Sequence, residues 1–390
     1  MNRKKFTIIA VIVYLASTIT SYAAFSNQSL LSNTPGSSTN TAKDKGNNYE
    51  AMVFDETAKK SEECPLNGEY YSKEHKKWWE KHRPLGVMIE NHLDARPQSG
   101  INAADVTYES VAEGGITRTL NVYYCNDAGI VGPVRSARTY FLDYISEYGA
   151  NPLYAHVGGA NTPGPANALG QIDDYGWNQY NDLNQFSIGF PTYRRDESRL
   201  GREVATEHTM YSTTSKLWDF AAKKRKLTDK DEDGKSWDED FVKYSFKKDE
   251  SEAKRPANQS IHLDFWDDSS YAVDWVYRKD TNDYARKNAG VAHVDRNTNK
   301  QLIARNIVVL FMRESHANDG YEGNAHMLYG TKGTGKALVY IDGKETKATW
   351  SKKNREARTI IKDSSGEEIE FNRGKIWFEI QPLDGVVTAR

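Results

Sequence analysis

Arginine side chains that could bind an anion are concentrated around one short segment of this chain. The segment, residues 132–138, reads Gly-Pro-Val-Arg-Ser-Ala-Arg. It follows a predicted strand and precedes a predicted helix, so it could direct two guanidinium groups and helix N-terminal amides toward a phosphate or a carboxylate. We therefore expect an anion-binding site formed by Arg118, Arg135, Ser136 and Arg138.

Two carboxylates precede these arginines in the chain. Glu109 and Glu113 are four residues apart, and on a helical turn this spacing would place both on one face. In a binding site, Glu109 would contact the ligand and Glu113 would orient or polarise it. The alternative is a buried structural network in which these acids pair with the arginines, because buried ion pairs are common and do not demonstrate catalysis. The sequence leaves both alternatives open.

Two histidines could complete such a site. His156 ends an apolar run before a Gly-Gly pair, and His208 lies in the segment Thr-Glu-His-Thr-Met. If both converge on the arginines, they are candidates, together with Glu113, for general acid and base catalysis near neutral pH. A lone histidine on a strand is more often a structural residue. Three polar residues further upstream extend the predicted ligand contacts; they are Asn91, Arg96 and Gln98.

Four aspartates resemble the ligands of a calcium loop. They occupy positions 1, 3, 5 and 12 of the loop template and are Asp229, Asp231, Asp233 and Asp240. Position 8 of the template is Ser236 instead of an apolar residue, and position 12 is usually Glu. We therefore favour a solvated acidic loop over a calcium site, and we predict no metal and no cofactor.

Three β-like runs are expected to position the candidate side chains. They cover residues 85–89, 119–124 and 152–157, and polar or glycine-bearing turns follow each of them. Sites on layered α/β folds usually lie at such turns. Helical periodicity marks residues 70–82, 139–148 and 215–224. The order of strands and helices favours α/β or α+β layering for this part of the chain.

The C-terminal part is predicted to be mostly β. Its period-two runs are residues 271–277, 303–312, 336–341, 358–361 and 375–380, with turn signals between several of them. The prediction for the whole chain is an α+β protein, in which an N-terminal α/β-type layered domain is followed by a smaller, mostly β domain.

Composition divides the chain into five predicted segments. They are a signal peptide (1–23), a disordered spacer (24–63), the N-terminal domain (64–222), a charged linker or hairpin (223–259) and the C-terminal domain (260–390). Cleavage after Ala23 is favoured over an uncleaved anchor, because serines and threonines dilute the apolar run. Residues 161–202 show little periodicity, and a loop of that length is usually functional or mobile.

Export from the cytoplasm constrains the chemistry and argues against a free nucleotide cofactor. The 52 basic and 54 acidic residues give a formal net charge of −2, which argues against a general nucleic-acid binder. The two cysteines, Cys64 and Cys125, are expected to form a disulfide in an oxidising compartment, and two unpaired thiols are the alternative.

Four sequence blocks resemble those of a known family. They are residues 96–100 (Arg-Pro-Gln-Ser-Gly), 112–118 (Ala-Glu-Gly-Gly-Ile-Thr-Arg), 132–138 and 156–159 (His-Val-Gly-Gly). In this order they are similar to the blocks of the YerB-like bacterial lipoprotein family. The resemblance runs from about residue 83 to the C-terminus and implies a two-domain envelope protein without an assigned reaction. Members often carry a cysteine for lipid attachment, which this chain does not have after its apolar run.

Together these observations predict an extracytoplasmic envelope protein, secreted or tethered to the outer face of the cytoplasmic membrane. Its expected ligand is anionic, a wall polymer or the phosphorylated precursor of one. Its expected partners are cell-wall or envelope components and not nucleic acid, with membrane attachment only through an uncleaved N-terminal segment. One alternative is an enzyme, a hydrolase or a phosphoryl or glycosyl transferase, that uses the same pocket. Another is a regulatory scaffold that binds wall-synthesis proteins through residues 260–390.

Overall fold

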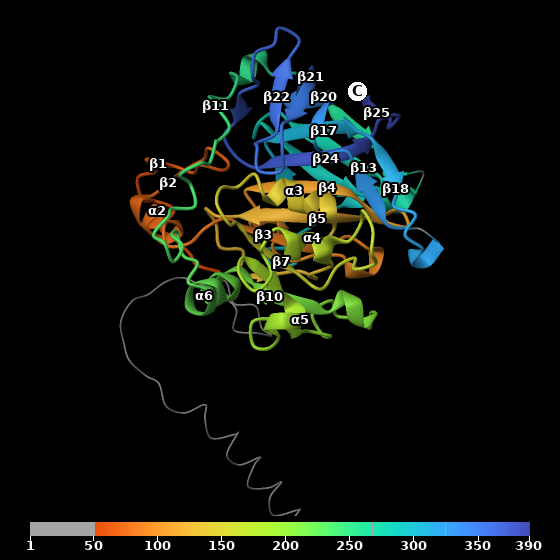
Figure 1. The fold of residues 1–390 in the computed structure, drawn as a ribbon. Coiled ribbons are helices and arrows are strands. Elements are labelled where there is room, and N and C mark those ends of the chain that lie inside the picture. The colour runs from red at the N-terminus through yellow and green to blue at the C-terminus, as the bar shows by residue number, and fades with distance from the viewer. Residues whose placement is uncertain (1–50, 267, 324) are drawn as a thin grey trace, which may run out of the picture. The chain divides into compact units, whose positions relative to one another are not determined.

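The computed structural model describes residues 51–390 except residues 267 and 324. The predicted signal peptide and most of the predicted spacer lie outside the described residues. The described part is built on a ten-stranded mixed sheet with the order β22-β21-β20-β17-β24-β4-β5-β3-β7-β8 (Figure 1). Within this part of the chain, every helix is too short or too polar to cross a bilayer.

The ten strands come from both ends of the described chain. In sheet order they are β22 (Ile360–Asp363), β21 (Lys344–Lys352), β20 (Gly333–Ile341), β17 (Asn306–Met312), β24 (Ile376–Pro382), β4 (Val106–Glu113), β5 (Ile116–Tyr123), β3 (Leu85–Glu90), β7 (Leu153–His156) and β8 (Asp182–Asn184). The strands expected from apolar or period-two runs overlap members of this sheet in every case but one, residues 271–277, which lie in a second sheet.

One parallel pairing joins the two parts of the chain. β24 pairs with β4 in parallel, which places Glu379 opposite Glu109, and β24 also pairs in parallel with β17. Residues on both sides of segment 223–259 therefore share one sheet. The fold is α+β, with sheet predominating, and the domain boundaries expected at 64–222 and 260–390 stay a prediction.

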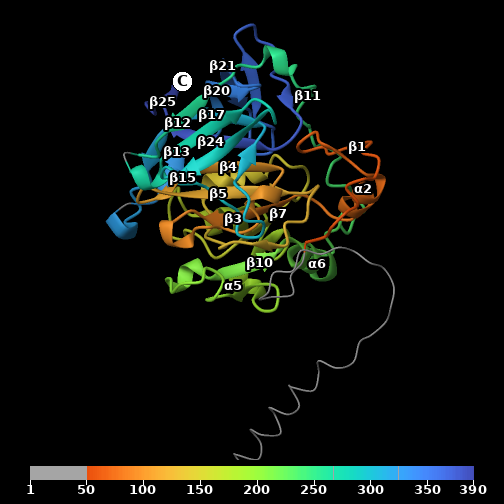
Figure 2. The same cartoon turned by 180° about the vertical axis from the view of Figure 1, so that it is seen from behind.

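A second sheet covers one face of the ten-stranded sheet (Figure 2). Its order is β15-β14-β13-β12-β25, with β16 beside β14. Its members are β15 (Val291–Ala292), β14 (Asp283–Asn288), β13 (Val273–Arg278), β12 (Ser260–Leu263), β25 (Val387–Ala389) and β16 (Ile303–Ala304). Trp275 of β13 meets Trp377 of β24 with their ring centroids 5.2 Å apart. The two sheets therefore enclose one of the two apolar cores.

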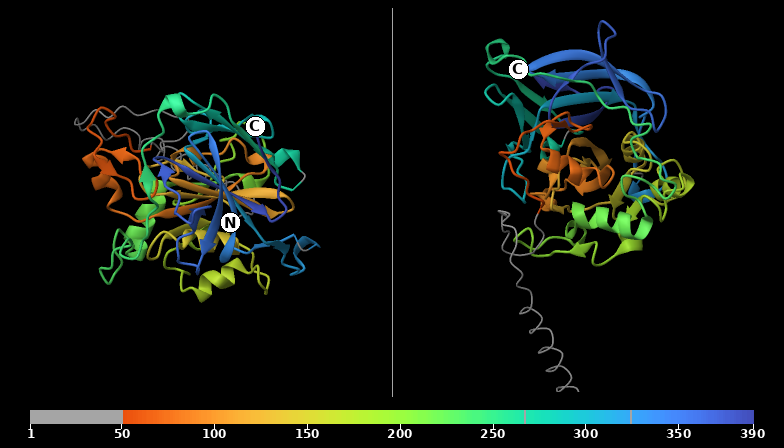
Figure 3. Two further views of the ribbon diagram at one scale, coloured as in Figure 1. Left: turned by 90° about the horizontal axis from the view of Figure 1, so that it is seen from above. Right: turned by 90° about the vertical axis from the view of Figure 1, so that its left-hand side faces the viewer.

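Helices cover the other face of the ten-stranded sheet. α3 (Thr139–Ile145) lies in front of β4 and β5, with α4 (Ala168–Asp174) beside it (Figure 1). The ring of Tyr144 on α3 stacks on Tyr108 of β4 with centroids 4.5 Å apart. Viewed from above, the blue C-terminal strands cross the yellow and orange N-terminal strands, because strand twist accumulates across so wide a sheet (Figure 3).

The sequence of β24 shows how one strand serves both cores. Its residues alternate, so Ile376 and Phe378 enter the core beneath α3, and Trp377 enters the core beneath the second sheet. By the same alternation, Glu379 and Gln381 face the second sheet, and both are buried. The fold thus brings polar groups into an apolar layer, where they need partners.

The remaining elements are short. The helices are α2 (Lys73–Trp79), α5 (Gln185–Ile188) and α6 (Thr214–Arg225), with 3-10 turns η1 (Leu93–Ala95), η2 (Ile101–Ala103), η3 (Thr206–His208), η4 (Glu252–Lys254), η5 (Ser269–Tyr271) and η6 (Tyr321–Gly323). The strands are β1 (Glu62–Glu63), β2 (Tyr70–Tyr71), β6 (Ile130–Val131), β9 (Arg194–Arg195), β10 (Met210–Thr213), β11 (Phe246–Lys247), β18 (Glu314–His316), β19 (Met327–Tyr329) and β23 (Phe371–Asn372). The three helices expected from periodicity correspond to α2, α3 and α6.

Three segments are more ordered than their composition predicts. Residues 161–202 contain α4, β8, α5 and β9 instead of one long loop, and residues 62–63 of the predicted spacer form β1. In segment 223–259, Trp237 and Tyr244 are buried, and β11 pairs in parallel with β23. Short elements of this kind are stabilised by tertiary contacts, so local sequence patterns do not show them.

Glu109 and Glu113 do not lie on a helical turn, the case in which their spacing would place both on one face, because both residues belong to strand β4. Aromatic and β-branched neighbours, such as Tyr108 and Val111, favour a strand over a helix. The pairing of β4 with β5 shifts register between Val111 and Glu113, which marks a bulge. Since a bulge turns the following side chain in a new direction, the two glutamates contact different partners.

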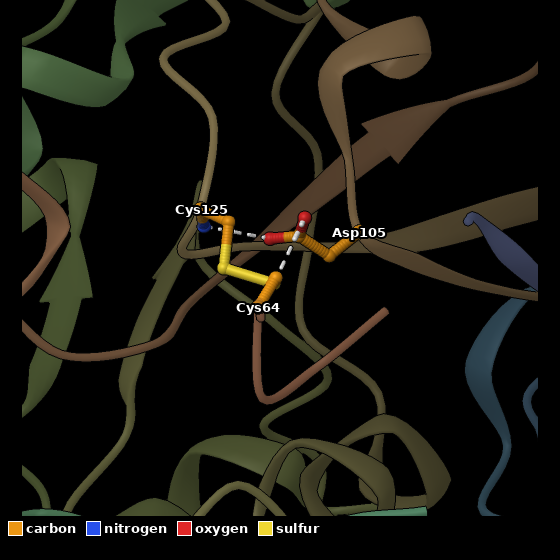
Figure 4. Close-up of side chains that lie close together, drawn as sticks. All are labelled: Cys64, Asp105 and Cys125. Atoms are coloured by element: carbon orange, nitrogen blue, oxygen red, sulfur yellow. Dashed lines mark hydrogen bonds between the residues drawn. A yellow bond between two sulfur atoms is a disulfide. The ribbon is translucent and has the colours of Figure 1, made fainter. Parts of the chain in front are cut away.

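Cys64 and Cys125 form the predicted disulfide, and both are fully buried (Figure 4). The bridge ties the segment before α2 to the end of β5. Asp105 lies beside it and accepts hydrogen bonds from the backbone N–H groups of Tyr124 and Cys125 at 2.8 and 2.9 Å. Burial raises the pKa of the Asp105 carboxyl to about 7, although these two donors act in the opposite direction.

Replacing both cysteines, as in Cys64→Ala with Cys125→Ala, should lower the free energy of unfolding. The bridge closes a chain segment with a sequence separation of 61, and loss of a closure of that length costs about 4 kcal/mol through the entropy of the unfolded chain. Urea unfolding of the oxidised protein and of the double variant measures the difference. A loss below about 1 kcal/mol would show that the bridge does not restrain the unfolded chain as expected.

Candidate functional site

A cleft of about 670 Å³ lies at one end of the parallel strands β3, β7 and β8. β3 pairs with β7 in parallel, and β7 pairs with β8 in parallel. The carboxyl ends of these strands therefore meet at one edge of the sheet, which is where open α/β sheets usually bind ligands. The side chains and backbone that matter for its chemistry belong to Arg135, Ser136, Gly158, Asn184, Phe186 and Arg195.

Arg135 is fixed on the wall of the cleft by its backbone and by one nitrogen of its side chain. Its backbone N–H donates to Met88 of β3 at 2.9 Å, and its backbone oxygen accepts from Val157 at 3.0 Å. Its Nε donates to a carboxylate oxygen of Glu90. The two terminal nitrogens have no partner within the described residues, and 25% of the side chain is exposed. Arg135 is thus held in place with donors still available to a ligand.

Arg195 reaches the same cleft from β9 and is exposed. Its Nη1 donates to the backbone oxygen of Thr206 and, at 3.2 Å, to Oγ1 of Thr209. Its other side-chain nitrogens have no partner among the residues that the structure describes. Glu207 also lines the cleft, so two arginines and one glutamate leave a net positive lining.

The two other predicted arginines do not line the cleft, because Glu113 binds both of them. Arg118 and Arg138 each donate to the Glu113 carboxylate, and both are almost completely buried. Burial by itself would raise the pKa of Glu113, but the two guanidinium charges outweigh it and hold that pKa well below its ordinary value. These three side chains form the buried structural network that the sequence left as an alternative.

Glu90, which the sequence analysis did not select, links this network to the cleft. It ends β3, is almost completely buried, and binds Arg135. Burial would raise the pKa of Glu90, but the charges of Arg118 and Arg135 lower it. An acid directly after the apolar run 85–89 was the sequence signal that could have identified it.

His208 lies beside Glu90 and His92 and does not line the cleft. Its Nδ1 is 4.0 Å from a Glu90 oxygen and has no hydrogen-bond partner within the described residues. Its ring stacks on His92 with centroids 4.8 Å apart. Burial lowers the pKa of His208 from 6.5, and the Glu90 charge opposes that change.

His156 is fully buried, and both of its ring nitrogens contact acceptors. Nε2 bonds to Oδ1 of Asp182 at 2.5 Å, and Nδ1 bonds to the backbone oxygen of Gly158 at 2.6 Å. His156 therefore holds Gly158 in place at the end of β7, and a catalytic role for it or for His208 stays a prediction.

The other predicted ligand contacts lie in a buried network between the two sheets. Asn91 donates to Glu109 at 3.1 Å and accepts from Arg96 at 3.1 Å and from Gln98 at 2.8 Å. Arg286 of the second sheet donates to Glu109 at 2.6 Å. Every one of these side chains is committed to another, so the network holds the sheets together and does not reach the cleft.

Glu379 is a second buried acid beside this network. It faces Glu109 across the β4–β24 pairing, and its Oε1 accepts from Nε1 of Trp275 at 2.8 Å. Burial, followed by the charge of Glu109, raises the pKa of Glu379 to about 8, and Arg286 acts in the opposite direction. The surroundings of this carboxyl therefore favour its protonated form in the folded protein.

Metal binding finds little support in the residues that the structure describes. Two groups place potential ligands near one another; they are Cys64, Asp105 and Cys125, and His92, Asp94 and His208. The first group contains a disulfide and has no thiolate to offer. In the second group the histidine rings are nearly parallel, at 11°, so their lone pairs do not converge on one ion, and Asp94 already binds Arg202.

Two of the four aspartates of the calcium-loop template, Asp231 and Asp240, bind groups of their own loop. Asp231 accepts from the backbone N–H groups of Asp233 and Lys235 at 3.1 and 2.9 Å. Asp240 pairs with the Lys235 ammonium at 2.9 Å. A solvated acidic loop, which also includes Asp229 and Asp233, stays a prediction.

Three residues of the cleft were missed individually by the sequence analysis, and they are Asn184, Phe186 and Arg195. All three belong to residues 161–202, the segment whose length indicated a functional or mobile loop. That signal located the segment but not its residues. The pairing of β8 with β7 places Asn184 and the following Phe186 at the cleft, and the pairing of β9 with β10 places Arg195 there.

The chain matches known proteins along most of its length. Residues 68–228 and 261–378 match the N-terminal and C-terminal domains of the family described as "Protein of unknown function (DUF3048)". A Bacillus subtilis (strain 168) protein named "Putative lipoprotein YerB" is 30% identical over 330 residues, which are 84% of this chain and 88% of that protein. The crystal structure of YerB from Bacillus subtilis has a TM-score of 0.68 at 23% identity and covers 85% of this chain and 100% of that chain.

Glu113→Gln should destabilise the fold. Removal of the carboxylate leaves Arg118 and Arg138 buried without the acid that pairs with both of them, which costs about 3 to 5 kcal/mol. Urea unfolding at neutral pH measures the loss, and Glu74→Gln, which changes an exposed glutamate on α2, is the control. A loss no larger than the ~1 kcal/mol typical of an exposed pair would contradict a structural role.

Glu379→Gln should remove part of the pH dependence of stability. The pKa of Glu379 is about 8 in the folded protein against an ordinary value of 4.5, so the folded state binds the extra proton between these values. The contribution of this extra proton to the free energy of unfolding is fully present below the ordinary pKa of 4.5. It is lost as the pH rises through the folded-state pKa of about 8. Unfolding free energies at several pH values across this window should fall with pH in the original protein and fall less in the variant. An unchanged slope would contradict the raised pKa.

Proposed function

The chain belongs to the DUF3048 family, and from this premise we propose that it is a cell-envelope protein that binds an anionic ligand. The Bacillus subtilis relative is named "Putative lipoprotein YerB", and this name supports a location at the cell envelope. The proposed ligand is a wall polymer or its phosphorylated precursor, bound on the outer side of the cytoplasmic membrane. The site is the cleft at the carboxyl ends of β3, β7 and β8.

One observation carries this proposal: two guanidinium groups with available donors line the same cleft. Arg135 and Arg195 each use part of their donor set on the protein and leave the remaining N–H groups unpaired within the described residues. Guanidinium donors form strong, charge-assisted hydrogen bonds to phosphate and carboxylate oxygens. Ser136, next to Arg135, adds a hydroxyl group to the same lining.

The anion site therefore differs from the one expected from the sequence in two of its arginines. Arg118 and Arg138 both bind Glu113 and are shielded from solvent, so Arg195 takes their place in the proposed site. Arg135 and Ser136 remain. Glu90 contributes by holding Nε of Arg135, which directs the rest of that guanidinium toward the cleft.

Arg135→Gln and Arg195→Gln should each weaken anion binding by about tenfold or more, because a hydrogen bond to a charged group contributes about 1.5 to 3 kcal/mol. Calorimetric titration with inorganic phosphate and with poly(glycerol phosphate) measures the affinity, and binding should weaken as salt is added. Lys223→Gln removes an equal charge from exposed α6 and is the control.

Two results would contradict the proposal. One is that the original protein binds neither probe. The other is that Lys223→Gln weakens binding as much as the cleft variants, which would indicate a general charge effect. Arg135→Gln also takes a partner from buried Glu90, so its thermal unfolding is measured as well. Arg195 is exposed, and Arg195→Gln therefore tests the cleft without that complication.

A further inference from the structure

An exposed aromatic ring is held in position at the cleft. Phe186 lies on α5, lines the cleft, and is 77% exposed. Its ring packs against Gly158, where an added Cβ atom would lie 2.9 Å from a ring carbon. Gly158 has a φ of +58°, so the backbone there also favours glycine. The Phe186 ring therefore packs directly on the Gly158 backbone, although most of the ring surface faces solvent.

Asn184 links the ring to its glycine support. Its Oδ1 accepts hydrogen bonds from the backbone N–H groups of Gly158 at 3.0 Å and of Phe186 at 3.2 Å. These two donors fix which end of the side-chain amide is the oxygen. The Nδ2 group, which has no partner among the described residues, is left as a donor at the cleft. Ring and amide donor are thus presented by one short, internally bonded turn.

The lining combines features that a simple anion would not use. Beside the two arginines it contains Val157, Leu169 and Met210, which are apolar. A saccharide ring has an apolar face of C–H groups and hydroxyl groups around its edge. The face suits an aromatic ring, and the hydroxyl groups suit an amide donor such as Asn184.

We propose that the ligand of the cleft is an acidic saccharide, with its sugar ring against Phe186, a hydroxyl on Nδ2 of Asn184, and its phosphate or carboxylate on Arg135 and Arg195. This inference rests on the proposed function and names the chemical class of the ligand. Asn184 has a second role, because it positions both Gly158 and Phe186.

Phe190 provides a matched comparison within the same segment. It is 82% exposed, four residues after Phe186, but it does not line the cleft. If exposed aromatic surface alone promoted binding, both phenylalanines would contribute. Under the proposal, Phe186 contributes and Phe190 does not.

The test uses two phosphate monoesters that differ in the sugar ring. Glucose 1-phosphate should bind the full-length protein about tenfold more tightly than glycerol 3-phosphate, in line with the size of aromatic ring contacts. Phe186→Ala should reduce this difference and leave the affinity for inorganic phosphate unchanged. Phe190→Ala should retain the difference, and Phe186→Tyr should restore it.

Three outcomes would overturn the proposal. One is equal affinity for the two monoesters, and another is an equal loss in Phe186→Ala and Phe190→Ala. Tighter binding of uridine 5′-monophosphate than of glucose 1-phosphate would assign the ring to a nucleobase instead. In each of these cases the proposed anion site would still stand if inorganic phosphate binds and Arg195→Gln weakens that binding. If inorganic phosphate also fails to bind, the proposed function fails together with the saccharide subsite.

Discussion

Two buried carboxylates that face each other across the β4–β24 pairing impose the main constraint on this structure. Glu109 and Glu379 occupy opposite positions on neighbouring parallel strands and are both fully buried, so each needs a partner within the protein. Arg286 binds Glu109 and lies over the ring of Trp377, and Trp275 donates to Glu379. Because these partners come from the second sheet, the large sheet needs the second sheet as a source of charge and donors as well as apolar cover.

The same reasoning separates structural arginines from those available to a ligand. Arg118, Arg138 and Arg286 are buried and bind carboxylates, so their charges are neutralised within the fold. Arg135 and Arg195 keep donors at an open edge of the sheet. The difference arises from location. Arg118, Arg138 and Arg286 lie over or between sheets, where an unpaired charge costs too much desolvation free energy. Arg135 and Arg195 lie where strands end.

Local patterns predicted much of the fold but less of the site. The apolar run before Glu90 and the alternation in β24 are visible in the sequence, and both are strands. The pairing of β24 with β4 was not predictable, because the two strands are more than two hundred residues apart and no local feature specifies a partner. For the site, Arg135 and Ser136 were selected from the sequence and line the cleft, whereas the place of Arg195 depends on how β9 pairs with β10.

The sequence by itself determined the class of fold, the disulfide, the resemblance to a family and the segment rich in arginine. These follow from residue type and spacing, which act locally or through the two cysteines that the chain contains. Only the tertiary structure decided which arginines meet Glu113 and which meet the cleft. A guanidinium group can neutralise a buried acid or bind an outside anion, and the choice depends on burial and on neighbours that the fold brings from distant parts of the chain.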